Sequence, residues 1–169
     1  MAGVSIEDAA FPDDQAYAFD KAVARIEAAA EAARAVSGDF VLVARADGVM
    51  NGHYDMAEAL RRIRAFDAAG ADCLYVPVPP SLDALKDVIA ATEKPVNVLM
   101  VGPFAKMSRG DMAALGAARL SLGSALARAT HRVIHDAGQA MFKDGDFSAM
   151  ARTIGGGTVD ALLSGKNAG

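Results

Sequence analysis

Short runs of strand-forming residues alternate with longer stretches of helical periodicity along most of this sequence. The strand-type runs lie at residues 4–6, 40–44, 73–76, 96–99 and 120–122. The helical patterns between them lie at about 17–36, 56–69, 82–91 and 111–115. This alternation is typical of βαβ units, and a spacing of about 20 to 35 residues per unit suits barrels and doubly wound folds. The sequence therefore predicts an α/β fold with five parallel strands.

The joints between these segments support the same assignment. Gly70 and Gly116 each follow a helical pattern and precede an apolar strand, where a left-handed C-cap is favoured. Ser124 is a candidate N-cap for a long helix through about residue 142, and residues 145–148 begin a short helical segment. The glycine-rich stretch 155–169 predicts a flexible tail with a minor helix. We expect one domain over residues 1–154 and a tail over residues 155–169.

Composition narrows the class of partner. Of the 169 residues, 53% are hydrophobic, the net charge is −4 and like charges form no block, which disfavours disorder and nucleic-acid binding. No stretch approaches the ~18 apolar residues of a membrane span, and Glu7 and Asp8 stand where a signal peptide would be basic and then apolar. Cys73 lies in an apolar run and is expected to be a buried, reduced thiol. These features predict a cytoplasmic protein with a small-molecule partner.

Polar side chains follow three of the predicted strands. Glu7 and Asp8 end the first strand, Arg45 and Asp47 end the second, and Ser124 comes just after the fifth. Because functional groups of parallel β/α folds gather at the carboxyl ends of strands, we expect these side chains at one rim. Carboxylates there suit a hard cation such as Mg²⁺, and an arginine suits a carboxylate or phosphonate. The alternative is a purely structural ion-pair cluster.

Other polar residues have both functional and structural interpretations. His53 lies in the loop after Asp47, where it either reaches a ligand or remains solvated. Asn97 lies inside an apolar strand, so it needs a hydrogen-bond partner, either substrate or a neighbouring strand end. Ser121 and Ser124 fall where many barrels bind phosphate, although an N-cap role explains Ser124 equally well.

An ordered set of short motifs between residues 2 and 150 resembles one enzyme superfamily. The set includes Gly3-Val4-Ser5-Ile6-Glu7-Asp8, Phe40 through Asp47, Ala69-Gly70-Ala71-Asp72 and Lys94 through Met100. In this order and spacing it resembles the isocitrate lyase/phosphoenolpyruvate mutase superfamily, and within it a less characterised mutase-like branch. The resemblance implies a TIM-type β/α barrel. Since a complete barrel takes ~250 residues, we expect a partial barrel of about five strands with C-terminal helices extending from it.

The resemblance also implies a chemistry. Members act on C–C or C–P bonds beside a carboxylate in small 2-oxo or related acids, with Mg²⁺ stabilising an enolate-like species. Arg45 matches the arginine that binds the acidic group of the substrate, and Glu7 matches the glutamate that holds a water of the Mg²⁺ shell. Both are candidate catalytic residues, and Arg45, Asp47, His53 and Asn97 are candidate substrate-binding residues.

Several motifs of the superfamily have no match here. Direct metal ligation belongs to an Asp-x-Asp-x-Gly-(Tyr/Phe)-Gly segment that would precede Met1, and the mutase-like Lys-x-Asn gating loop is missing. The lyase motif Lys-(Lys/Arg)-Cys-Gly-His is replaced by Ala9 through Asp14, and Pro77 stands where many members carry His or Glu. We therefore expect an incomplete active site, and the alternative is a non-catalytic homologue that self-associates.

The outer strands of the predicted sheet lack barrel neighbours. Strands 4–6 and 120–122 would leave backbone N–H and C=O groups unpaired beside apolar side chains such as Ile6 and Leu122. The superfamily packs C-terminal helices between subunits, which points the same way. A homo-oligomer is therefore expected.

Overall fold

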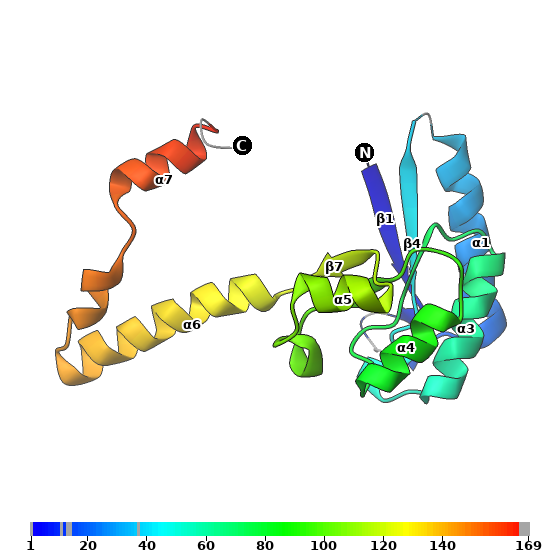
Figure 1. Ribbon diagram of the computed structural model, residues 1–169, viewed down its shortest axis with the longest axis horizontal. Helices are drawn as coiled ribbons and strands as arrows, with labels where there is room; N and C mark the ends of the chain where they lie inside the picture. Colours follow the sequence, from blue (N-terminus) through cyan, green and yellow to red (C-terminus); the bar gives the residue numbers. More distant parts are fainter. Residues whose placement is uncertain (1, 11, 13–14, 37, 166–169) are drawn as a thin grey trace. The chain divides into compact units, whose positions relative to one another are not determined.

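A computed structural model of the chain describes residues 2–10, 12, 15–36 and 38–165 (Figure 1). The chain divides into two compact units, Met1–Gly123 and Ser124–Gly169. The predicted division after residue 154 falls inside the second unit and stays a prediction. Three residues of the segment that replaces the lyase motif, at 11, 13 and 14, and residues 166–169 of the predicted tail lie outside the described residues.

Five parallel strands form the sheet of the first unit. They are β1 (Ala2–Glu7), β4 (Phe40–Arg45), β5 (Cys73–Tyr75), β6 (Asn97–Leu99) and β7 (Arg119–Ser121). Strand β4 lies between β1 and β5, β6 pairs with β7, and a bridge between Leu74 and Val96 joins the two ladders. These five strands follow one another in sequence order and are parallel, as predicted.

A short antiparallel ribbon follows β1 and was not predicted. Its strands are β2 (Ala9–Ala10) and β3 (Gln15–Ala16). The amide of Tyr17 donates to the carbonyl of Asp8 at 2.7 Å, which returns the chain to the end of β1. Strands of two residues are too short to show a period-two pattern, so the sequence gives no sign of them.

Helices connect the strands at nearly the predicted positions. They are α1 (Phe19–Ala35), α3 (Met56–Ala68), α4 (Leu82–Ala90) and α5 (Arg109–Leu115), with two unpredicted short helices, α2 (Gly48–Asn51) and η1 (Gly102–Phe104). The side chains of Asp55, Ser81 and Ser108 accept hydrogen bonds from backbone amides in the first turns of α3, α4 and α5. Gly116 ends α5 with a φ of 98°, the left-handed cap that its position predicted.

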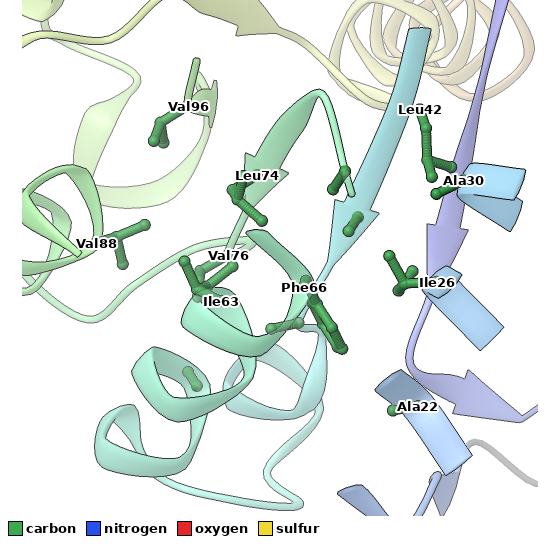
Figure 2. Packing of buried hydrophobic residues seen from close by; sticks show 14 of the residues in the cluster. Ala22, Ile26, Ala30, Leu42, Ile63, Phe66, Leu74, Val76, Val88 and Val96 are labelled. Carbon is green, nitrogen blue, oxygen red and sulfur yellow. The ribbon is translucent and has the colours of Figure 1, made fainter. Parts of the chain in front are cut away.

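One face of the sheet packs against the helices and forms the main core (Figure 2). Side chains from β4, β5, α1 and α3 meet there, among them Leu42, Leu74, Ile26, Ile63 and Phe66. Because side chains alternate along a strand, the residues between them point to the opposite face, which carries Val43, Cys73 and Tyr75. The sheet therefore has one apolar face that is covered by helices and an opposite face that carries Val43, Cys73 and Tyr75.

Two further predictions concern the state of Cys73 and the presence of a membrane span. Cys73 is buried and free, as the sequence indicates. Burial raises the pKa of its thiol, which keeps the thiol protonated. No helix in the described part of the chain is both long and apolar enough to cross a membrane.

The second unit is helical. It contains α6 (Ala125–Gln139), a π-helical turn (Ala140–Asp144), a 3₁₀ turn (Ser148–Arg152) and α7 (Gly156–Leu163). Ser124 is the N-cap residue of α6, as predicted, but its side chain makes no capping hydrogen bond. Its φ of −86° and ψ of 3° lie outside the extended region in which N-cap side chains usually make that bond. The glycine run is not simply a joint, since Gly156 and Gly157 form the first turn of α7.

Candidate active site

The register of β1 against β4 places Glu7 opposite Arg45. Arg45 Nη1 lies 2.7 Å from Glu7 Oε1, and both side chains are about one quarter exposed at 22% and 30%. Arg45 Nε and Nη2 donate to Asp47 Oδ1 at 3.1 and 3.0 Å. Glu7, Arg45 and Asp47, three of the side chains predicted to share a rim, therefore form one contiguous cluster.

Asp47 is the buried member of this cluster, at 1% exposure. Burial raises the pKa of Asp47 to about 7 against the pull of Arg45, and the negative charges of Glu7 and Asp8 raise it further. The ion pair with Arg45 is therefore made against a desolvation cost. Such a cost is common where a carboxylate is kept in place for function, although structural clusters show it too.

Tyr75 and Asn97 lie on the next strands of the sheet. The Arg45 guanidinium carbon lies 5.0 Å from the centre of the Tyr75 ring. On β6, Asn97 Nδ2 donates to Ser121 Oγ at 2.9 Å. Asn97 thus finds the neighbouring strand end that its position required. Its Oδ1 is nevertheless buried without a hydrogen-bond partner in the described part of the chain.

His53 lies apart from this chain of contacts. Its backbone amide donates to the carbonyl of Gly48 at 2.8 Å, and its side chain is exposed. Across the described ranges, no hydrogen bond or ion pair joins the His53 side chain to Glu7, Arg45 or Asp47. Its role as a substrate contact stays a prediction.

Two residues beneath the cluster, Tyr54 and Arg62, were missed by the sequence analysis. Asp8 Oδ2 accepts from Tyr54 Oη at 2.6 Å and from Arg62 Nη1 at 2.9 Å, and Asp8 Oδ1 accepts from the amide of Asp47 at 2.8 Å. Asp8 and Arg62 are buried, at 3% and 5% exposure. Asp8 was expected at the rim beside Glu7, but nothing local in the sequence marks Tyr54 or Arg62 as its partners.

Backbone strain follows the end of β5. Pro77 is followed by Val78, which has a φ of 46°. A β-branched residue rarely adopts this left-handed conformation, and Pro79 restricts the backbone of Val78 further. Strain of this kind is more common at functional sites than elsewhere.

The carboxylate groups of the residues that the structure describes do not form a site that would bind Mg²⁺ directly. Asp8 uses both oxygens within the protein, and Asp47 and Glu7 are each paired with Arg45. Within the residues that the structure describes, no group of three or more His, Cys, Asp or Glu side chains is placed to hold a metal ion. Glu7 is partly exposed, so its carboxylate is suited to accept a hydrogen bond from a water molecule of a hydrated ion and not to bind the ion directly.

Fold and site together define an α/β protein of parallel βα units whose charged residues gather at the carboxyl ends of neighbouring strands. Comparison with known sequences makes the class specific. The chain belongs to the phosphoenolpyruvate phosphomutase family, whose pattern matches residues 1–142.

Individual relatives are longer than this chain. The oxaloacetate decarboxylase of Paraburkholderia xenovorans (strain LB400) is 36% identical over 111 residues, which are 60% of this chain and 34% of that protein. A Burkholderia cenocepacia J2315 protein, provisionally described as a lyase/mutase, has a crystal structure with 38% identity and a TM-score of 0.89. The match covers 95% of this chain and 58% of that protein.

A third comparison bears on the fold alone. A phosphonopyruvate hydrolase, crystallised with oxalate and Mg²⁺, is 22% identical with a TM-score of 0.74, and the match covers 97% of this chain and 59% of that one. The chain thus spans about a third of the curated relative and somewhat more than half of each solved structure.

Proposed function

We propose that this chain contributes the acid-binding part of an active site that acts on C–C or C–P bonds of small 2-oxo or related carboxylic acids. The observation that carries the proposal is the Arg45 guanidinium, held at the rim between Glu7 and Asp47. Membership of the phosphoenolpyruvate phosphomutase family supports it, as does the name of a similar protein, an oxaloacetate decarboxylase.

Arg45 is arranged to bind a carboxylate or phosphonate end-on. A guanidinium carries five N–H groups, and Arg45 directs Nε and Nη2 at Asp47 and Nη1 at Glu7. One N–H on each terminal nitrogen is then left for a ligand, which is the geometry of a bidentate Arg–carboxylate pair. Glu7 and Asp47 hold the fork still, so less entropy is lost on binding.

In the proposed active site, Glu7 is the residue that would interact with a hydrated Mg²⁺ ion. When bound, Mg²⁺ would stabilise the negative charge of an enolate. Glu7 would accept a hydrogen bond from one of its waters, while Asp47 and Asn97 would orient the substrate beside Arg45. The direct ligands of Mg²⁺ would have to come from outside the described residues. The proposed location of the protein is the cytoplasm, which the free Cys73 supports.

The proposed architecture is a partial β/α barrel that self-associates. Five strands in sequential order, and a match to relatives that are longer than this chain, support a partial barrel. Among the described residues, β1 pairs only with β4 and β7 pairs only with β6, which leaves an edge of each strand free. The second unit exposes large apolar side chains, including Phe142 at 94% and Leu163 at 82%. A homo-oligomer would cover such surfaces.

Oxalate is the probe for the acid-binding role, because it resembles the enolate of a 2-oxo acid. Calorimetric titration of the purified chain, with and without Mg²⁺, should show saturable oxalate binding that Arg45→Met weakens at least about tenfold, the loss of a charge-assisted pair. The matched control is Arg61→Met, which removes an exposed arginine of α3 and should leave the affinity unchanged.

Measurements of turnover and of oxalate binding together distinguish an incomplete active site from a non-catalytic homologue. We expect little Mg²⁺-dependent turnover of oxaloacetate or phosphonopyruvate by the 169-residue chain, since the residues that the structure describes include no group of three or more His, Cys, Asp or Glu side chains placed to hold a metal ion. Oxalate binding without turnover supports an incomplete active site. The absence of any saturable oxalate binding by a folded, self-associated chain would instead favour the non-catalytic homologue.

A further inference from the structure

Asp8 lies at the centre of a buried network, and its carboxylate accepts three hydrogen bonds from other residues of that network. Oδ2 accepts from Tyr54 and Arg62, at 2.6 and 2.9 Å, and Oδ1 accepts from the backbone amide of Asp47 at 2.8 Å. The exposed fractions of the Asp8 and Arg62 side chains are 2% and 6%. Each ion is therefore removed from water and relies on the other.

Arg62 is itself held from several directions. Its Nε donates to Glu58 and its Nη2 donates to the carbonyl of Tyr17, both at 2.9 Å. Its guanidinium carbon lies 4.6 Å from the centre of the Tyr54 ring. The network thus ties α3 to the loop after β4 and to the chain that returns from the β2–β3 ribbon. The desolvation of a buried ion pair largely cancels its attraction, so stability alone is a weak reason for such a network.

The network reaches Arg45 through its own carbonyl and through the backbone amide of Asp47, two residues further on. The amide of Asp8 donates to the carbonyl of Arg45 at 3.2 Å, and the Asp8 carboxylate holds the amide of Asp47. The Asp47 side chain then accepts from Arg45 Nε and Nη2. We infer that Asp8, fixed by Tyr54 and Arg62, is a positioning residue that orients the Arg45 fork toward its ligand. This inference rests on the proposed function of Arg45.

Two variants weaken the network without touching the proposed ligand-binding groups. Tyr54→Phe removes only the hydroxyl that donates to Asp8, and Arg62→Met removes the buried cation. Arg61→Met is the matched control, because Arg61 is the next residue on α3 and also binds Glu58 but is 56% exposed. If Arg62→Met does not fold, Tyr54→Phe decides the question alone.

Hydrogen exchange measured by NMR tests the inference without any ligand. In Tyr54→Phe, the Asp47 amide and the Arg45 Nε–H should exchange about tenfold faster, which corresponds to ~1.4 kcal/mol of local opening. Core amides such as those of Leu42 and Leu74 should keep their rates. Oxalate should bind more weakly to the same variant, while Arg61→Met should match the unmodified chain in both measurements.

Two results would overturn the positioning role. One is unchanged exchange at Asp47 and Arg45 in Tyr54→Phe. The other is an equal acceleration at all core amides, which would make the network a general stabiliser. If the unmodified chain binds no oxalate, the proposed function fails, but the exchange rates still show whether Asp8 positions Arg45.

Discussion

Gly48 lies directly against the ring of Tyr54, and its lack of a side chain permits that contact. A Cβ at position 48 would overlap three carbon atoms of the ring, which is also held by the hydrogen bond from Tyr54 Oη to Asp8. Gly48→Ala should therefore lower the free energy of unfolding by about 1–3 kcal/mol, the usual cost of overpacking. Urea denaturation followed by circular dichroism would measure it.

The control for this variant is Gly110→Ala, on α5. A Cβ there would meet only Ser108 Oγ, at an ordinary 3.6 Å, and alanine is the better helix former. This change should be neutral or should stabilise by up to about 1 kcal/mol. Equal destabilisation by both changes would contradict the specific role of the Gly48–Tyr54 contact.

Asp72 makes stability depend on pH. Burial by itself would raise the pKa of Asp72, but hydrogen bonds from Arg34 and from the amide of Leu42 outweigh it, so the pKa lies below its ordinary value of 3.8. A carboxyl with a lowered folded-state pKa adds stability that is fully present above its unfolded-state pKa. That stability is lost as the pH falls through the folded-state pKa.

Urea unfolding between pH 6 and pH 2 would test this dependence. Asp72→Asn should be less stable than the unmodified chain at neutral pH, and the difference should shrink below about pH 4. The comparison variant is Asp87→Asn, which should follow the unmodified chain. Asp87 is exposed on α4, and its side chain makes no hydrogen bond to another described residue. A constant difference across the whole range would show that charge is not what Asp72 contributes.

At the residue scale, the sequence predicted the cluster but not its support. Glu7, Arg45 and Asp47 were found because the carboxyl ends of parallel strands share a rim, a rule that needs only strand positions. Tyr54 and Arg62 were missed because their link to Asp8 spans 46 and 54 residues and depends on how α3 packs. Their amphipathic side chains read equally well as surface residues.

At the scale of elements, two serines at the starts of helices behave differently. Ser108 forms a capping box with Asp111 at the start of α5, whereas Ser124 makes no side-chain cap at α6. Ser108→Ala should therefore cost about 1 kcal/mol of unfolding free energy, and Ser124→Ala should cost close to nothing. Thermal unfolding of both variants, followed by circular dichroism, would check this, and a comparable loss in Ser124→Ala would contradict the described geometry.

The elements that the sequence predicted show either a helical period or a run of apolar residues. The helices α1 and α3 repeat apolar residues over several turns, and β4 begins with five consecutive apolar residues. The helix α2 has four residues and begins at Gly48, so its only local signal is a glycine that reads as a turn. The conformation of Val78 was equally unpredictable, because a valine gives no hint of a left-handed backbone.

At the scale of the whole molecule, we expect self-association through the second unit. Val133 and Ile134 are adjacent on α6 and are 70% and 68% exposed, although both are strongly apolar. Replacing both by lysine should shift the population toward a monomer, because a charged surface resists burial in an interface. Light scattering coupled to size exclusion at micromolar concentration would report the mass.

Gln139→Lys supplies the control for charge alone, since Gln139 is also exposed on α6. It should leave the mass distribution unchanged. A monodisperse species of 17.4 kDa for the unmodified chain, with cooperative unfolding, would contradict the expected homo-oligomer.

The pairing of β1 with β4 has a consequence for the order in which the chain is made. Ala2 pairs with Phe40 and Glu7 with Arg45, so β1 is synthesised well before its partner. At translation rates of about 5–20 residues per second, the partner follows roughly 2 to 8 seconds later. Until β4 has been synthesised, the parallel pairing of β1 with β4 cannot begin. Formation of this part of the sheet therefore has to wait for the synthesis of α1 and β4, and β1 by itself cannot start it.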